Sequence, residues 1–485
     1  MNQVITRIAP SPTGNLHLGT VRTALYNLLF AKAHGGKFYF RLEDTDQQRS
    51  TKEFEEEIIA GFKWLGIAWD APEGMEHEDG MLRQSKQNSA HQKIIDNLLE
   101  KNIAYKCYAT PEELDEMRKE QRAQKKAEGY DNRSRNLSPE QISAYEAQGR
   151  KYVVRLNIGE DRDIKWQDLV RGDMSINTRD LGGDPVIQKF NGQVLYNFAV
   201  VCDDNAMQVS HVIRGEDHLT NTAKQIAICE AASLKVPEFG HLPLIFTKDK
   251  QKLSKRKHGD IAGVEKYKNE GYLADALNNY LVASSYTDQN EQEKEVYTIT
   301  EATTGFSHEG ISKSPAIYDI QKLNWFNREY MSRFSNQEFL EACMPYLSFK
   351  LEEKYNKEQI DLMIESIRGN LDKFSDIDNE VNYFFSTQAV PEKLTKFLNE
   401  GSDLLKKLLE NIEADKYDFN DAVALKDAIN QLGEELSLSG KKLFFPIRVA
   451  ISSRQGGPDL GVIMHLLGKE EVINRITQSL KEKTC

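Results

Sequence analysis

A polar segment near the start of the chain has residue types that suit the binding of an anion. It runs Arg7-Ile-Ala-Pro-Ser-Pro-Thr-Gly14 and continues, two residues later, with His17-Leu-Gly-Thr20. An alternating run rich in β-branched residues (4–8) precedes it, and apolar residues at helical spacing follow it until Gly35-Gly36. A strand, a tight loop and a helix in this order direct free backbone N–H groups and the positive helix end to one place. A phosphate would be stabilised there.

A lysine-rich segment far downstream could take part in the same chemistry. It runs Lys252-Leu-Ser-Lys255-Arg and follows a predicted strand at residues 242–246. Such a segment is usually a solvated turn, and a histidine at the position of His17 commonly only caps or packs against its helix. Lysine, however, carries a compact charge on a flexible stem that can follow phosphate oxygens. The two segments together predict a nucleotide site with His17, Lys252 and Lys255 as its catalytic residues.

The combination of these two segments resembles the two signatures of class I aminoacyl-tRNA synthetases, and in detail it is similar to the bacterial glutamyl-tRNA synthetases. The resemblance covers essentially the whole chain. It implies that glutamate and ATP give glutamyl-adenylate and pyrophosphate, and that the glutamyl group then passes to the terminal ribose of tRNA(Glu). Mg²⁺ is expected to accompany ATP rather than to occupy a protein cage. Thr20 stands where the signature has a second histidine, so its hydroxyl or backbone would replace an imidazole.

The resemblance assigns the substrates to particular residues. The expected ATP-binding residues are Pro10, Ser11, His17, Gly19, Thr20 and Lys255, and the expected glutamate-binding residues are Arg7, Ala9, Ser11, Glu43, Tyr196 and Arg214. Glu43 is expected to accept a hydrogen bond from the substrate ammonium. Arg7, Tyr196 and Arg214 suit glutamate because two carboxylates call for two guanidinium groups and a hydroxyl donor fixes orientation. Which arginine holds which carboxylate stays open, and a structural ion pair of Arg214 with Glu216 or Asp217 is the alternative.

The expected fold class is α/β, with a Rossmann-like parallel-sheet catalytic domain, an inserted α+β acceptor-stem domain and an all-helical C-terminal anticodon-binding region. The predicted boundaries are 1–84 plus 194–249 for the catalytic domain, 85–193 for the insert, 250–330 for the lysine-loop and stem-contact domain, and 331–485 for the helical region. Predicted strands at 37–42, 194–201 and 209–213 would place polar residues at their carboxyl ends, where such sheets bind ligands. Asp46 or Ser50 is expected to cap a helix over 52–65.

The insert differs from many members of the family at an expected zinc site. Those members bind zinc with a Cys-x-Cys pair and a later Tyr-x-x-x-Cys element. Here Cys107 and Tyr130 remain, while Ala109 and Ser134 occupy the other two cysteine positions. One thiolate and one phenol do not make a tetrahedral zinc site. We therefore expect no structural zinc and no other protein-bound metal.

Composition favours a soluble cytoplasmic protein. The five cysteines are scattered, no signal peptide is visible, and no apolar run approaches the roughly 20 residues that span a bilayer. The net charge of −12 alone would argue against a nucleic-acid partner. Basic stretches at 118–135 and 248–258 can nevertheless contact RNA locally, although a solvated surface is the alternative for each. The absence of a heptad seam favours a monomer.

Three other functions remain open at this point. A glutaminyl-tRNA synthetase would share the chemistry, but its relatives carry β-barrels where this chain has helical patterns. A small-molecule nucleotidyltransferase would not need the long helical region, and the third alternative is a non-catalytic RNA-binding homologue. Whether tRNA(Gln) is also a substrate is undecided. Arg368 and Arg448 are candidates for anticodon contact, with a structural role favoured for each.

Overall fold

The computed structural model describes residues 3–46, 49–72, 80–287 and 295–481. They form two compact units. The first comprises Met1–Lys266 with Leu277–Ile320, and the second comprises Tyr267–Ala276 with Gln321–Cys485. No helix in these described ranges is long and apolar enough to cross a membrane.

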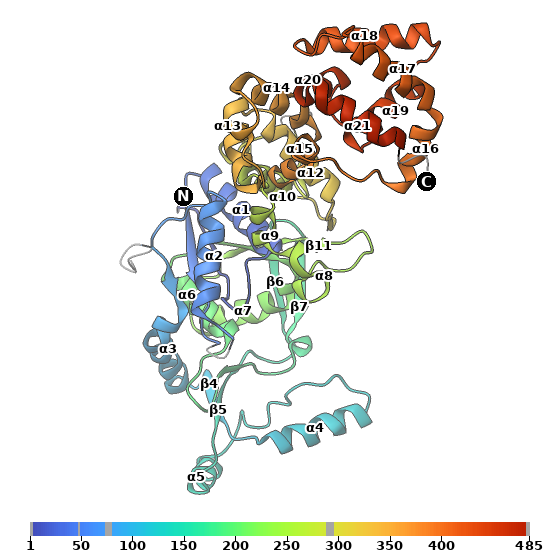
Figure 1. Cartoon of the computed structure of the whole chain (residues 1–485). Helices are drawn as coiled ribbons and strands as arrows, with labels where there is room; N and C mark the ends of the chain where they lie inside the picture. Colours follow the sequence, from blue (N-terminus) through green and yellow to red (C-terminus); the bar gives the residue numbers. More distant parts are fainter. Residues whose placement is uncertain (1–2, 47–48, 73–79, 288–294, 482–485) are drawn as a thin grey trace. The chain divides into compact units, whose positions relative to one another are not determined.

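The first unit begins with a parallel sheet in the order β1-β2-β3. Its strands are β1 (Ile5–Ile8), β2 (Lys37–Leu42) and β3 (Leu82–Arg83), connected by α1 (Leu18–Ala33) and α2 (Lys52–Trp64) (Figure 1). All of β1 and nearly all of β2 is buried because the sheet is covered on both faces. The strand–loop–helix unit at residues 4–34 and the strand at 37–42 are confirmed.

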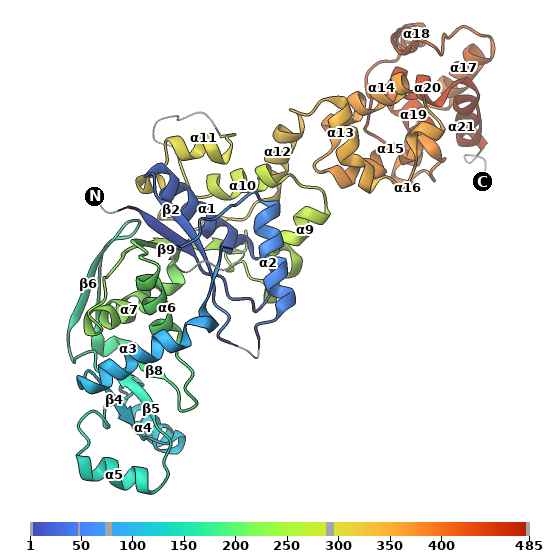
Figure 2. The same cartoon turned by 90° about the vertical axis from the view of Figure 1, so that its left-hand side faces the viewer.

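A second sheet, in the order β7-β6-β10-β9, lies beside β1. Its strands are β6 (Asp163–Asp168), β7 (Gly172–Asn177), β9 (His211–Gly215) and β10 (Glu238–Leu242), and α6 (Tyr196–Ala206) and α7 (Leu219–Ala231) accompany them (Figure 2). The backbone N–H of Ser210 donates to the Ile5 carbonyl at 2.9 Å, which joins the two sheets. Strands β9 and β10 are parallel, and β6 is parallel to β10. Two strands of the predicted insert thus complete the sheet that contributes β9.

The rest of the first unit is built from shorter elements. A three-stranded antiparallel sheet contains β4 (Ala104–Cys107), β5 (Val153–Leu156) and β8 (Val186–Gln188), and the helices near it in the chain are α3 (Asn88–Glu100), α4 (Pro111–Ala123) and α5 (Pro139–Ala147). Both α4 and α5 begin with a capping box and a proline in the first turn, which fixes their starts. The remaining elements are β11 (Ile245–Phe246), β12 (Ala316–Ile317), α8 (Lys255–His258) and α11 (Ile299–Thr304), while α9 (Val264–Asn269) and α10 (Ala274–Ala283) have residues in both units.

The second unit is helical throughout its described residues. Its helices are α12 (Ile320–Met331), α13 (Asn336–Cys343), α14 (Lys357–Ile367), α15 (Ile377–Phe385), α16 (Glu392–Glu400), α17 (Ser402–Glu413), α18 (Ala422–Glu435), α19 (Lys441–Ser452), α20 (Leu460–Leu467) and α21 (Lys469–Lys481) (Figure 1). Their apolar faces, with Phe339, Phe384 and Leu408 among them, form one buried core. The expected fold class is confirmed, whereas the four-part division by residue ranges stays a prediction.

Three local predictions are wrong. The apolar run at 194–201 is not a strand; helix α6 begins at Tyr196 within it. Because both faces of α6 are buried, its residues lack the amphipathic period, and such a run suits a buried helix as well as a buried strand. Helix α2 is capped by Thr51, whose Oγ1 accepts from the Phe54 N–H at 3.3 Å, and not by Asp46 or Ser50. The strand expected at 242–246 is two strands, β10 and β11.

Candidate active site

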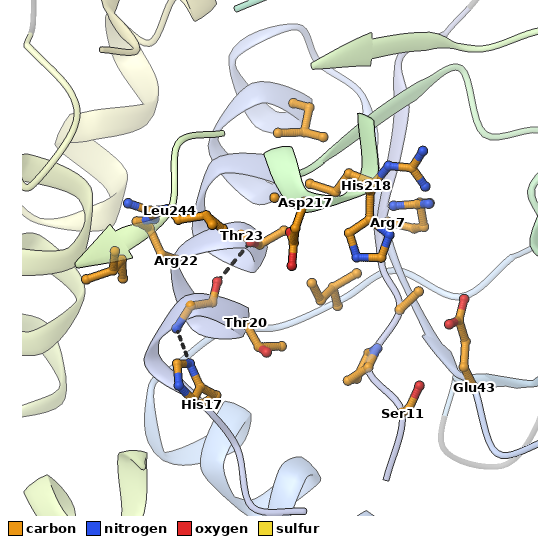
Figure 3. A pocket seen from close by; sticks show the side chains of 18 of the residues that line it. Arg7, Ser11, His17, Thr20, Arg22, Thr23, Glu43, Asp217, His218 and Leu244 are labelled. Carbon is orange, nitrogen blue, oxygen red and sulfur yellow. Dashed lines mark hydrogen bonds between the residues drawn. The ribbon is translucent and has the colours of Figure 1, made fainter. Parts of the chain in front are cut away.

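One cavity in the first unit brings together the predicted substrate residues. Its volume is about 370 Å³. Its walls include Arg7, Ala9, Pro10, Ser11, His17, Gly19, Thr20, Glu43, Tyr196, Arg214 and Lys252 (Figure 3). These residues come from the end of β1, the start of α1, the end of β2, the start of α6, the end of β9 and the lysine segment. Lys255 is the exception, because its side chain lies outside the described part of the structure.

His17 both caps helix α1 and faces the cavity. Its Nδ1 accepts a hydrogen bond from the Gly19 N–H at 3.0 Å, and its carbonyl accepts from the Thr20 N–H at 2.9 Å. Burial, assisted by the charge of Lys252, lowers the pKa of His17. The ring is therefore neutral at physiological pH, and since Nδ1 is an acceptor, its proton is on Nε2. The capping role and a role as a hydrogen-bond donor to a phosphate are compatible.

Lys252 is paired with a carboxylate at the rim of the cavity. Its ammonium lies 2.8 Å from the Asp217 carboxylate. Burial opposes the ionisation of Asp217, but the hydrogen bond and charge of Lys252, the neighbouring His218 and a backbone hydrogen bond together lower the pKa of that carboxyl. Glu216 is also occupied, because it pairs with Arg171 and accepts from the Leu244 N–H. The alternative of an ion pair between Arg214 and Glu216 or Asp217 is therefore wrong.

A buried network of charges forms the wall that contains Arg7. Arg7 donates to Asp204 through Nε at 3.1 Å and Nη2 at 3.2 Å. Arg41 donates to the same carboxylate at 2.5 Å and to Glu43 at 3.1 Å. Burial raises the pKa of Glu43. The pKa of Asp204 is lowered, because the charges and hydrogen bonds of Arg41 and Arg7 together outweigh the effect of burial. Each cation is thus compensated by a carboxylate, as a buried charge requires.

Arg214 differs from Arg7 and Arg41 because no carboxylate contacts it among the described residues. It is buried, its Nη2 donates to Thr222 Oγ1 at 2.7 Å, and its Nε is 3.4 Å from His241 Nε2. Its Nη1 has no hydrogen-bond partner in the part of the chain that the structure describes. Burial lowers the pKa of Arg214 to about 10, so the group stays cationic at neutral pH. A buried cation with an open N–H at the wall of a cavity is suited to an anionic ligand.

Tyr196 and His218 lie next to each other beside Arg214. The Tyr196 hydroxyl is 3.4 Å from His218 Nδ1. Burial and the Glu43 carboxylate raise the pKa of Tyr196 to about 12, so the phenol remains a hydrogen-bond donor. Burial and the charge of Arg214 lower the pKa of His218 to about 4. The ring of His218 is therefore a neutral acceptor at physiological pH.

The sequence interpretation did not assign three residues of this site: Arg41, Asp204 and His218. Arg41 is an arginine in an otherwise aromatic, buried strand, which is a signal that a buried counterion must exist elsewhere. Asp204 lies in helix α6, where the sequence predicts a strand, so the direction of its side chain does not follow from the predicted strand. His218 closes the segment Arg-Gly-Glu-Asp-His at the carboxyl end of β9, where ligands commonly bind.

The low pKa of His218 makes stability dependent on pH. In the unfolded chain this histidine takes up a proton near pH 6.5, whereas in the folded chain it stays neutral to about pH 4. Folding stability from this group is therefore present above pH 6.5 and lost as the pH falls. We expect the unfolding free energy to fall by roughly 2 kcal/mol more in the wild type than in His218→Asn between pH 7 and pH 5. Urea titrations of both proteins measure this; parallel pH dependences would contradict it.

Hydrogen bonds connect the residues that remain at the expected zinc position. Cys107 Sγ is 3.2 Å from the Tyr130 hydroxyl, which accepts from the Ser134 N–H at 3.1 Å. Within the described ranges, no three His, Cys, Asp or Glu side chains are grouped so that they could hold a metal ion. The zinc-free insert stays a prediction. We expect less than about 0.1 equivalent of zinc after dialysis against a chelator, measured by plasma emission, because two ligands cannot hold the ion. One retained equivalent would refute it.

Two family models together match most of the chain. The family model "tRNA synthetases class I (E and Q), catalytic domain" matches residues 3–325, and the model "Anticodon binding domain" matches residues 338–480. The chain is therefore a class I tRNA synthetase.

Similar proteins define the family more narrowly. Glutamate–tRNA ligase 1 of Caldanaerobacter subterraneus subsp. tengcongensis is 39% identical over 99% of this chain and 98% of its own length. The glutamate–tRNA ligase of Nostoc punctiforme is 37% identical over 99% of both chains. The crystal structure of the Elizabethkingia meningosepticum glutamate tRNA ligase, in complex with its amino acid, gives a TM-score of 0.84 at 33% identity and covers 99% of each chain. The chain belongs to the glutamate–tRNA ligase family, as its sequence predicted, and these relatives lend no support to the glutaminyl alternative.

Proposed function

We propose that this enzyme uses ATP, accompanied by Mg²⁺, to activate L-glutamate and then transfers the glutamyl group to tRNA(Glu). The observation that carries the choice of amino acid is Arg214, a buried cation at the cavity wall with an open N–H and no carboxylate partner among the described residues. A neutral amino-acid side chain would leave this charge uncompensated, whereas glutamate supplies the missing anion.

We assign the side-chain carboxylate of glutamate to Arg214. The α-carboxylate loses its charge when it becomes an acyl phosphate, so it is a poor permanent partner for a buried cation. The side-chain carboxylate keeps its charge throughout the reaction. Arg7 already makes two hydrogen bonds to Asp204, so its charge is largely compensated by that carboxylate. Its remaining N–H groups could donate one further hydrogen bond to the substrate. Glu43 would accept from the substrate ammonium, and Tyr196 would donate a hydrogen bond.

Activation requires an α-carboxylate oxygen of glutamate to attack the α-phosphate of ATP as pyrophosphate leaves. No nucleophilic side chain is needed, so the protein contributes positioning and charge stabilisation. The Nε2–H of His17 would donate to a phosphate oxygen, and the positive end of helix α1 would stabilise the charge of the phosphates. Lys255 and Lys252 would follow the leaving pyrophosphate, and Mg²⁺ would screen its charge. Thr20 would contribute its hydroxyl at the helix start, where it lines the cavity.

The helical unit is proposed to bind the anticodon arm of the tRNA. Arg368 has a structural role, because its Nη2 donates to the carbonyls of Met331 and Phe334 after helix α12. Arg448 remains a candidate: it donates to the Pro458 carbonyl at 2.6 Å and lines a second cavity of about 340 Å³. We leave open whether tRNA(Gln) is also charged, and we propose that the enzyme acts as a cytoplasmic monomer.

Charging of total tRNA tests this function. The purified enzyme is incubated with ATP, Mg²⁺ and labelled glutamate, and charged tRNAs are then protected from periodate and sequenced. We expect tRNA(Glu) among the protected species. Label found in no tRNA would contradict the function, and protection of tRNA(Gln) as well would show relaxed tRNA choice with the same chemistry.

A further inference from the structure

Three neighbouring strands carry a continuous chain of hydrogen bonds that ends at Arg214. Asp168 ends β6, His241 lies on β10 and Arg214 lies on β9, in the spatial order β6-β10-β9. The register pairs Arg214 directly with His241 across the two parallel strands. Thr222, on α7, completes the set. Neither the substrate assignment nor the fold requires this particular combination of side chains.

The direction of each hydrogen bond in this chain is determined by Asp168. Its Oδ1 accepts from the backbone N–H groups of Val170, Arg171 and His241 at 3.0–3.1 Å, and its Oδ2 lies 2.5 Å from His241 Nδ1. Although burial opposes its ionisation, these hydrogen bonds lower the pKa of Asp168 to about 2. Asp168 is thus a carboxylate that only accepts, so Nδ1 of His241 must carry a proton.

The other nitrogen of His241 is then an acceptor. Burial lowers the pKa of His241, so the ring is neutral and Nε2 carries no proton. Thr222 Oγ1 lies 2.9 Å from Nε2 and can donate to it, while the same oxygen accepts from Arg214 Nη2 at 2.7 Å. Arg214 Nε also points to Nε2 at 3.4 Å. Two neutral acceptors therefore orient the guanidinium.

We propose that Asp168 and His241 are positioning residues for Arg214: they fix the guanidinium through neutral acceptors, so that its charge stays available to the side-chain carboxylate of the substrate. A carboxylate in place of His241 would orient Arg214 equally well, but it would also neutralise it and weaken the selection of an anionic substrate. This inference rests on the proposed role of Arg214 in glutamate binding. It also gives the segment 85–193, the predicted insert, one residue that acts on the amino-acid site, namely Asp168.

Asp168→Asn is the sharpest test because it is nearly isosteric. Three backbone N–H groups hold Oδ1 of Asp168, so the new amide must keep its oxygen there and turn its NH₂ group to His241 Nδ1. The ring must then carry its proton on Nε2, which would face Arg214 as a donor. We expect the KM for glutamate to rise about tenfold or more while the KM for ATP changes less than about twofold. The same variant should also show a lower selectivity for glutamate over glutamine.

Thr222 provides an independent pair of variants should Asp168→Asn fold poorly. Thr222→Val removes the hydroxyl at nearly constant shape, and Thr222→Ser keeps it. We expect Thr222→Val to raise the glutamate KM about tenfold and Thr222→Ser to remain near the wild type. Asp184→Asn is the control for lost stability alone, since Asp184 is a buried carboxylate that contacts Tyr105 and Arg135 and does not line the cavity.

The results separate this inference from the proposed function. Suppose that the wild type charges tRNA with glutamate and that both Thr222→Val and Thr222→Ser have the wild-type KM for glutamate. The positioning role would then be wrong, and the proposed function would stand. The same conclusion follows if Asp168→Asn raises the glutamate and ATP KM values equally, as Asp184→Asn would through general loosening. If the wild type does not charge glutamate at all, the proposed function itself fails.

Discussion

Replacing Arg214 by leucine is expected to lower kcat/KM for glutamate about 10³-fold, because removal of one partner from a buried ion pair costs about 3–5 kcal/mol. The substrate carboxylate would enter a buried site that no longer contains its counterion. The KM for ATP should change less than about threefold, since Arg214 is assigned to the amino acid alone. Charging kinetics with glutamate and ATP varied in turn measure both quantities.

The stability of the same variant gives a second, opposite expectation. In the absence of glutamate, Arg214 is a buried cation with an N–H that no described residue pairs, so leucine should not lower the melting temperature. Arg155→Leu is the matched control. Arg155 is also buried, and its Nε also has no hydrogen-bond partner among the described residues, but its Nη1 donates to the Asp184 carbonyl at 2.6 Å, its guanidinium lies 3.6 Å from the centre of the Tyr130 ring, and it does not line the cavity. Arg155→Leu should have a lower melting temperature and the wild-type KM for glutamate. If instead Arg155→Leu raised the glutamate KM and Arg214→Leu lowered only the melting temperature, the assignment of Arg214 would be refuted.

His17→Asn is expected to slow adenylate formation about 10²–10³-fold, the usual loss for one donor to a transition-state charge. Asparagine is a good helix cap, so its side-chain oxygen can still accept from the Gly19 N–H. It lacks, however, the Nε2–H that reaches the cavity. Pyrophosphate exchange with tRNA present measures the rate, and circular dichroism checks that helix α1 is intact.

His34→Asn is the control for this substitution, because His34 lies at the other end of the same helix and bonds the Phe30 carbonyl. It should leave the exchange rate near that of the wild type. An unchanged rate in His17→Asn would mean that His17 acts only as a cap. Lys255 remains a predicted partner of His17 in this step.

Local sequence patterns were sufficient for the first part of the fold. The β-branched run, the prolines and the helical spacing after residue 17 predicted β1, its loop and α1, since each depends on neighbours in the chain. The same reasoning failed at α6, because this helix is buried on both faces and its apolar residues therefore do not recur with the helical period. It could not find the pairing of Arg41 with Asp204, because these residues are 163 positions apart and meet only in the folded chain.

The site residues were predictable because of their motifs, but their electrostatic state was not. Arg7 and Arg214 are both arginines at strand ends, yet Asp204 neutralises Arg7, while the hydrogen-bond partners of Arg214 among the described residues are the neutral side chains of Thr222 and His241. Lys252 turned out to be paired with Asp217. These differences depend on partners from distant strands, so only the structure shows that Arg7 is paired with a carboxylate while Arg214, among the described residues, is not.

The selectivity for glutamate over glutamine is the most direct test of the central claim that an uncompensated Arg214 selects an anionic amino acid. The two labelled amino acids are compared in charging of total tRNA by the wild-type enzyme, at equal ATP and Mg²⁺. We expect kcat/KM for glutamate to exceed that for glutamine by about 10⁴-fold, because a neutral amide leaves the buried guanidinium unpaired. Comparable values for the two amino acids would contradict the account.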